Sequence, residues 1–166
     1  MSWIRKKKTY SRPRKPFDKA RFEEEAVIVK TYGLEKKREI WKAEARIRDI
    51  RRIAKTLITA SEEEKKVLID KLKKIGLNVS NIADILALKK ENWLERRLQT
   101  IAFKKGLAKT AKQARQFITH RHVKVGGKIV NKPSYIVDVN EEGKIEVLAK
   151  PIKEIKEKKL EEIKNE

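Results

Sequence analysis

The side chains best suited to chemistry gather between residues 94 and 137, where eleven lysine and arginine residues stand beside a single carboxylate. An arginine presents a planar fork of donors that fits a phosphate group or stacks on a base, whereas a lysine acts as a point charge. So many cations in one segment indicate a polyanionic partner. The apolar spacing also changes from a helical to a strand period within the segment. We therefore predict a folded RNA-binding module here, rather than a basic tail.

Two short helices and a hairpin must position these cations. Helical spacing is shared by two runs of apolar residues, namely Leu94, Leu98, Ile101 and Ala102, then Ala111, Ala114, Phe117 and Ile118. We expect Gly106 to end the first helix and Thr110 to N-cap the second. A hairpin over residues 123–130 follows, because alternating apolar residues flank a Gly126-Gly127 pair that permits a turn with positive φ. Residues 145–147 are expected to pair back on this hairpin.

Before the module, the sequence predicts a lobe of helices. Asp18 is placed to cap a helix that Gly33 ends, and Ser61 and Gly76 bound another in the same way. Between them a longer helix runs over residues 36–58, with a narrow apolar stripe that we interpret as core packing. The opposite face is cationic and has few carboxylates nearby, which favours a phosphate-facing surface over a merely solvated one. Its members are Arg48, Arg51, Arg52 and Lys55.

Together these patterns predict an α+β fold in four parts. Residues 1–17 form a basic extended arm, residues 18–93 a helical lobe, residues 94–148 the RNA-binding module with its small antiparallel sheet, and residues 149–166 a charged tail. The arm holds seven basic residues and two prolines without a helical period, so it either orders on RNA or serves as a solubilising tail. The charged tail is expected to be an amphipathic helix or a frayed end, with a protein neighbour as one interpretation.

The formal net charge of +20 is divided unevenly along the 166 residues. Residues 1–60 carry +11 and residues 95–137 carry +10, whereas residues 61–94 carry +1 and residues 138–166 carry −2. Two basic blocks predict two RNA-binding surfaces, or one surface assembled from both. The sequence has no apolar run long enough to cross a bilayer and no secretion signal, so we expect a cytoplasmic protein without membrane contact.

Other chemistry finds little support in the sequence. Cysteine is absent, which excludes disulfides, thiol nucleophiles and cysteine-ligated zinc. His120 and His122 are the two histidines, and a transition-metal site needs three or four convergent donors, so we predict hydrogen-bonding or packing roles for them. The serines fall in tails, caps or turns, and no paired-carboxylate or phosphate-loop spacing occurs. We expect neither an enzyme nor a metal, a cofactor or a small-molecule substrate.

Six short motifs occur here in the order found in a known family. They are Leu94-Glu95-Arg96-Arg97-Leu98, Lys104-Lys105-Gly106-Leu107-Ala108, Gln113-Ala114-Arg115-Gln116, His120-Arg121-His122-Val123, the Gly126-Gly127 turn and Pro133-Ser134-Tyr135. Through them the chain resembles the small-subunit ribosomal protein four family, of archaeal or eukaryotic type, with its alpha-L RNA-binding module. The basic tail, the Tyr32-Gly33-Leu34 break and the arginine-rich helix near Trp41 extend the resemblance to residues 5–148.

The resemblance implies a structural constituent of the small ribosomal subunit. Such a protein would bind a multi-helix junction in the five-prime domain of the small-subunit ribosomal RNA, nucleate assembly and contribute to translational accuracy. It would contact small-subunit ribosomal protein five, other subunit proteins and messenger RNA near its entrance path. The resemblance further implies that the second module helix and the loop into the hairpin form the RNA surface.

The candidate RNA-binding residues come from three segments. The arm contributes Arg5, Arg12 and Arg14, and the long helix contributes Arg48, Arg51 and Arg52. The module contributes Arg96, Arg97, Lys104, Lys105, Lys109, Lys112, Gln113, Arg115, Gln116, His120, Arg121, His122, Lys124 and Lys128. We expect the arginines to fix the position of the RNA and the lysines to add affinity.

Two other functions remain open from sequence. A free-standing RNA chaperone or tRNA-binding module would need only residues 94–148, and the basic first 60 residues argue against it. A histone-like DNA-binding protein would also explain the charge. A preference for a folded RNA junction over duplex DNA would separate the ribosomal protein from the histone-like alternative.

Overall fold

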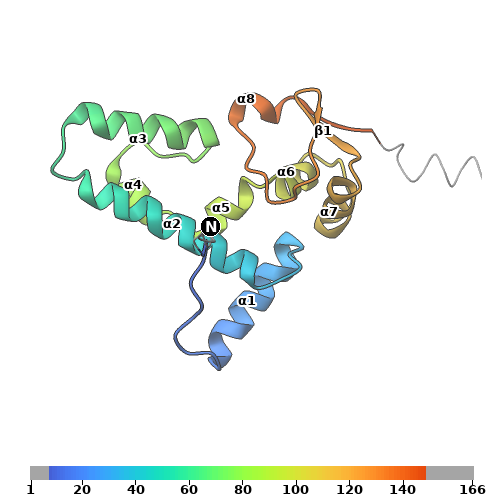
Figure 1. Cartoon of the computed structure of the whole chain (residues 1–166), viewed down its shortest axis with the longest axis horizontal. Coiled ribbons are helices and arrows are strands. Elements are labelled where there is room, and N and C mark those ends of the chain that lie inside the picture. Colours follow the sequence, from blue (N-terminus) through green and yellow to red (C-terminus); the bar gives the residue numbers. More distant parts are fainter. Residues whose placement is uncertain (1–7, 149–166) are drawn as a thin grey trace, which may run out of the picture.

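The computed structural model describes residues 8–148, and Figure 1 shows their arrangement. Eight helices and three strands occur in this part of the chain. Their bounds are α1 Lys19–Tyr32, α2 Arg38–Thr56, α3 Glu62–Ile75, α4 Ile82–Ala87, α5 Lys90–Glu95, α6 Leu98–Lys104, α7 Ala111–Thr119, β1 Val123–Val125, β2 Lys128–Ile129, α8 Val139–Glu142 and β3 Ile145–Val147. The α+β class is therefore confirmed. Among the described helices, none is long and apolar enough to cross a membrane.

The predicted helix ends depend on local signals, and the structure confirms them. Asp18 accepts the amide of Arg21 at 3.4 Å and begins α1, and Gly33 ends that helix in the left-handed conformation. Ser61 caps α3 in the same way, and Thr110 caps α7 by accepting the amide of Gln113 at 3.1 Å. Each cap supplies a partner that the helix itself cannot provide.

The apolar stripe of α2 forms the base of the helical part of the molecule. Ile47 and Ala54 pack with α3 and α4 in one cluster, while Ile40 and Ala43 pack with α1 and Leu94 in another. Trp93 of α5 is packed against both clusters. In Figure 1, α2 accordingly runs as a long axis with α1 at one end and α3 and α4 at the other.

The first module helix departs from the prediction, because Leu94 and Leu98 belong to different helices. The chain breaks at Arg96 and Arg97, where Arg97 forms an antiparallel bridge with Ile136. The amide of Leu98 also donates to the carbonyl oxygen of Tyr135 at 2.7 Å. This strand-like pairing interrupts the helix, and it involves residues that lie some forty positions later. The module boundary stays a proposal, and the packing of Leu94 with α1 and α2 favours placing it at this break.

The sheet follows the predicted hairpin. Its strand order is β2-β1-β3, both pairs are antiparallel, and Val123 lies opposite Val147. Gly126 and Gly127 adopt φ values of 55° and 80°, as a two-residue hairpin turn requires. The sheet packs on α6 and α7 through Leu98, Ile118 and neighbouring apolar residues. The sequence predicts a turn at Glu141-Glu142-Gly143, whereas residues 139–142 form the short helix α8 and Gly143 follows its end.

A close approach between helices makes Gly33 sensitive to substitution. A Cβ atom at this residue would lie 2.9 Å from the carbonyl carbon of Ala111 in α7. We expect Gly33→Ala to lower the free energy of unfolding by clearly more than the roughly 1 kcal/mol that a left-handed alanine costs by itself. Urea denaturation measures this loss.

Gly106 supplies the matched control, since its φ is 72° and no atom lies within 4 Å of its ideal Cβ position. Gly106→Ala should incur only the backbone cost. Equal losses in the two variants would show that the contact between Gly33 and α7 is not tight.

Candidate nucleic-acid interface

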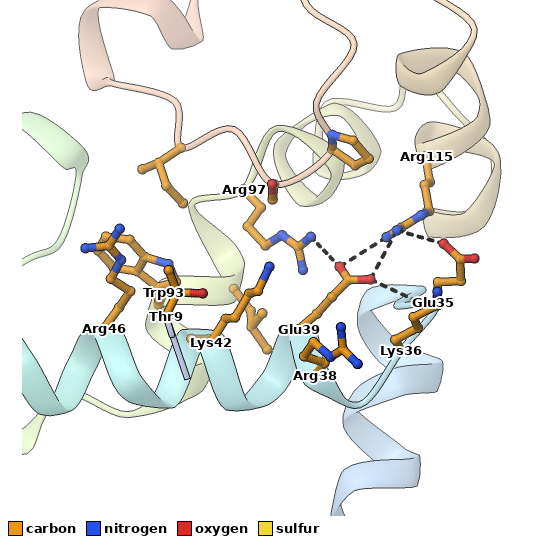
Figure 2. Close-up of a pocket in the computed structure, with 15 residues that line it drawn as sticks. Thr9, Glu35, Lys36, Arg38, Glu39, Lys42, Arg46, Trp93, Arg97 and Arg115 are labelled. Atoms are coloured by element: carbon orange, nitrogen blue, oxygen red, sulfur yellow. Dashed lines mark hydrogen bonds and ion pairs between the residues drawn. The ribbon is translucent and has the colours of Figure 1, made fainter. Parts of the chain in front are cut away.

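A partly buried network of ion pairs joins α2 to the module, as Figure 2 shows. The carboxylate of Glu39 accepts from the Arg97 guanidinium at 2.5 Å and from the Arg115 guanidinium at 3.1 Å. Arg115 also pairs with Glu35 at 3.1 Å. The Arg97 side chain is only 6% exposed. Burial by itself would raise the pKa of the Glu39 carboxyl group, but hydrogen bonds from Arg115 and Arg97 outweigh burial and lower that pKa.

Gln99 joins the same elements through backbone contacts. Its buried amide nitrogen lies 3.0 Å from the carbonyl oxygen of Tyr32, 2.9 Å from that of Gly33 and 3.0 Å from that of Ala111. Its side-chain oxygen accepts from Arg115 at 3.3 Å. One amide thus holds the end of α1 against the start of α7.

Arg96 makes a second joint on another side of the molecule. Its guanidinium donates to the carbonyl oxygen of Ile75 at 2.6 Å, and to the carbonyl oxygen of Val137 and the carboxylate of Glu142 at 3.1 and 3.0 Å. The group lies so close to Gly76 that a Cβ atom there would be 2.5 Å from it. The end of α3 is thereby joined to the module.

These contacts correct the expected placement of three arginines. The sequence analysis assigned Arg96, Arg97 and Arg115 to the RNA surface, whereas their guanidinium groups hold protein carboxylates and carbonyl oxygens. Arg97 is too buried to present its guanidinium to solvent. Arg115 lies on the face of α7 that turns toward the start of α2, where it pairs with Glu39 and Glu35. Direct RNA contact by Arg96 and Arg115 stays a prediction.

The network borders a groove of about 570 Å³ between α2 and the module, which we call the inter-lobe groove. Pro133, Ser134 and Ile136 line its module side. Its α2 side carries four cations that form no ion pair with a carboxylate in the described part of the chain: Lys36, Arg38, Lys42 and Arg46. Figure 2 shows Lys42 and Arg46 rising from α2 beside this space.

The sequence analysis missed these groove cations. Arg38, Lys42 and Arg46 are spaced four residues apart, which places them along one side of a helix. That spacing was a usable signal.

A second group of predicted residues lies on the outer surface of the module, from the end of α6 through α7 to the hairpin. The structure exposes Lys104, Lys105, Lys109, Lys112, Gln116, His120, Arg121, His122 and Lys128. Gln113 and Lys124 are half-buried. Lys104 pairs with Glu95 at 3.1 Å, and the Lys105 ammonium donates to the carbonyl oxygen of Glu142. The remaining exposed lysines form no ion pair in residues 8–148.

Arg121 occupies an unusual backbone conformation within this surface. Its φ of 63° is the one positive value at a non-glycine residue between residues 8 and 148. The left-handed turn separates His120 from His122, whose rings nevertheless stack with centroids 6.3 Å apart. Among the described residues, no group of three or more His, Asp or Glu side chains could hold a metal ion. The two imidazoles and the exposed Arg121 guanidinium are planar groups of the kind that stack on bases or donate to phosphates.

Most of the described arginines predicted on the arm and on α2 are exposed, whereas one is held by a contact within the protein. Arg12, Arg14 and Arg52 are exposed, and Arg5 lies outside the described residues. Arg48 is exposed and donates to the hydroxyl of Ser11 at 3.1 Å. Arg51 turns inward and donates to the carbonyl oxygen of Leu88. The predicted four-cation face therefore keeps Arg48, Arg52 and Lys55 outward, whereas Arg51 is part of the fold.

The arm itself contacts the helical part of the molecule. Tyr10 packs on Trp41 with ring centroids 6.1 Å apart and lies under the Arg38 guanidinium. Arg21 donates to the carbonyl oxygens of Lys15 and Pro16 at 2.6 and 3.0 Å. Residues 8–17 have no helix or strand, as expected, but they follow the surface of α1 and α2.

Comparison with known proteins adds independent findings. Residues 96–142 match the family model described as S4 domain. The small ribosomal subunit protein uS4 of Methanoregula boonei is 42% identical over 154 residues, which cover 86% of this chain and 83% of that protein. The proteins of the same name from Natronomonas pharaonis and Methanococcus aeolicus are 45% and 46% identical. Those alignments cover 84% and 83% of this chain, and 85% and 82% of the relatives.

The ion pairs of Glu39 give the joint a defined dependence on pH. Because the pKa of this carboxyl group is lower in the folded chain than in an unfolded one, its contribution to stability is present above about pH 4.3 and is lost as the pH falls through the folded pKa. Glu39→Gln should lower the free energy of unfolding at neutral pH by roughly 3 kcal/mol, since it leaves Arg97 buried without a counter-charge. The difference in melting temperature between the two proteins should shrink as the pH falls through this lowered pKa.

Glu62→Gln is the control, because Glu62 pairs with Lys65 at 2.8 Å but its own side chain is 78% exposed. This variant should melt almost as the unmodified protein does at neutral pH. A Glu39→Gln variant with unchanged stability would show that the network does not hold the joint.

Proposed function

Because the chain belongs to the family of small ribosomal subunit protein uS4, we propose that it binds small-subunit ribosomal RNA directly at a multi-helix junction in the five-prime domain. It is a structural constituent of the small ribosomal subunit and carries an RNA-binding S4 domain. At that junction it nucleates assembly of the subunit and contributes to translational accuracy.

The main support for this proposal is that both α2 and the module present cations without a carboxylate partner in the described chain. Lys42 and Arg46 border the inter-lobe groove on α2, while Lys112 and Arg121 lie on the outer surface of the module. Cations without protein partners favour phosphate groups, which release condensed counterions when they are bound. The two basic blocks of the sequence therefore act as surfaces of one fixed body.

The mechanism is recognition of shape by a preorganised surface. Glu39, Gln99 and Arg96 set the angle between α2 and the module before RNA arrives, so binding does not have to order the two parts. The exposed cations then meet phosphates at positions that a folded junction supplies and a straight duplex does not. Phosphate contacts fix the position of the protein without reading base sequence.

The family resemblance also supports several protein and RNA neighbours. We propose contact with small-subunit protein five and other subunit proteins, and with messenger RNA near its entrance path. The protein acts in the cytoplasm within the subunit, as a binding component rather than an enzyme. Residues 149–166, which lie outside the described residues, are proposed to meet a protein neighbour.

The test compares a folded multi-helix RNA junction with duplex DNA of equal length in a competition binding assay. The full chain should prefer the RNA junction. Lys42→Gln combined with Arg46→Gln should weaken junction binding by about 3 kcal/mol, if each charge-assisted contact contributes roughly 1.5 kcal/mol. The slope of log affinity against log salt should also fall by roughly 1.4 to 1.8.

A matched control removes the same charge elsewhere. Lys73 and Lys74 are exposed on α3, and replacing both with glutamine should leave junction affinity nearly unchanged. Equal affinity of the full chain for junction RNA and duplex DNA would support the histone-like alternative. Equal weakening by the two double variants would mean that net charge, not the groove, determines binding.

Arg121 offers a test that separates folding from binding. Glycine accepts the left-handed conformation without the cost of about 1 kcal/mol that a residue with a Cβ atom pays. Arg121→Gly should therefore raise the urea midpoint while it lowers RNA affinity. A variant with improved stability and full RNA affinity would remove Arg121 from the interface.

A further inference from the structure

A second groove lies on the other flank of α2. Its volume is about 310 Å³, and it is lined by Glu44, Ile47, Arg48, Arg51, Lys89, Lys90 and Glu91. None of these residues lines the inter-lobe groove. We call this space the α2–α5 groove, because α2 and the start of α5 form it.

Helix geometry explains why the two grooves are separate. With 3.6 residues per turn, Lys42 and Arg46 lie on one side of the buried stripe of α2, and Glu44 and Arg48 lie on the other. The stripe between them is covered by α5, whose Leu94 is fully buried. The α2 helix therefore separates two basic grooves that open on opposite flanks.

The α2–α5 groove is cationic and partly preformed. Arg51 is fixed by its donation to the carbonyl oxygen of Leu88, and its buried Nε has no hydrogen-bond partner among the described residues. Lys89 and Lys90 form no ion pair with a carboxylate in residues 8–148. Arg48 has one partner, Glu44, at 3.5 Å, and both side chains of that pair are more than half exposed.

The charge of this flank extends beyond the groove. Arg52 and Lys55 are exposed one turn further along α2, again without a carboxylate partner in the described chain. Like charges on one helix face repel one another, so the arrangement favours a partner that brings closely spaced negative charges. An RNA backbone supplies one phosphate per nucleotide, and arginine and lysine both bind it.

We propose that α2 bridges two RNA segments, with one phosphate backbone in the inter-lobe groove and a second in the α2–α5 groove. The inference rests on the proposed RNA-binding function and adds a second binding site to it. Two RNA backbones repel each other at close range, and a helix about 10 to 12 Å wide with cations on both flanks would screen that repulsion. The protein would then hold two arms of a junction at a set distance.

The test uses the full chain and two unlinked RNA hairpins, one carrying a donor fluorophore and the other an acceptor. A protein with two sites should bring the hairpins together, and energy transfer should rise, pass through a maximum and fall when protein is in excess. Arg48→Gln combined with Lys89→Gln and Lys90→Gln should reduce the maximum about tenfold. Binding of a single hairpin should persist through the inter-lobe groove with an unchanged salt slope, because the three replaced cations do not line that groove.

Controls keep the outcomes distinct. Replacing Lys71, Lys73 and Lys74 on α3 with glutamine removes the same charge and should leave the maximum unchanged. Full bridging by the Arg48, Lys89 and Lys90 variant would overturn the second site while the proposed function stands. A second contrary result is that the same variant bridges the hairpins fully but fails to bind a polyglutamate peptide that the unmodified chain binds. That result would assign the α2–α5 groove to an acidic protein and would also overturn the proposal. If the unmodified chain binds neither these hairpins nor a folded multi-helix RNA junction, the proposed function itself fails.

Discussion

The carboxylate of Glu39 is the contact on which the relative placement of the basic surfaces depends. It lies at the start of α2 and receives the guanidinium groups of Arg97 and Arg115, so one side chain joins the helical part to the module at two points. Gln99 reinforces the joint through backbone carbonyl oxygens on both sides. Without these contacts, the Arg96 joint and the close approach of Gly33 to α7 would be left to hold the cations of α2 and those of α7 in position.

The main effect of this joint is to set the angle between α2 and the module, rather than to add net stability to the fold. Removing charges from water is costly, and ion pairs of this kind often contribute little net stability compared with apolar packing. Here the ion pairs fix the relative orientation of α2 and the module, because a forked guanidinium group pairs well with a carboxylate only over a narrow range of positions. A preset angle lowers the entropy lost when a large polyanion binds, which explains why arginines of an RNA-binding module are used inside the protein.

The features that sequence predicted well are those decided by near neighbours in the chain. Thr110 caps α7 through a contact three residues away, and the Gly126-Gly127 turn joins neighbouring strands. The apolar stripe of α2 follows from the helical repeat of its own residues. The errors came from long-range contacts. The break after Glu95 depends on pairing with Ile136, and the inward direction of Arg97 depends on a carboxylate 58 residues earlier. No local pattern distinguishes an arginine that meets phosphate from one that meets a distant glutamate.

The order of the joint's members along the chain also has a consequence for synthesis. Arg97 follows Glu39 by 58 residues and Arg115 follows it by 76, so Glu39 is synthesised before either of its partners. The cluster of α2, α3 and α4 is complete by Leu88 and can form while Glu39 is still hydrated. The joint can close only after Arg115 has been synthesised, and only then are the cations of α2 and those of the module held at the angle that the RNA requires.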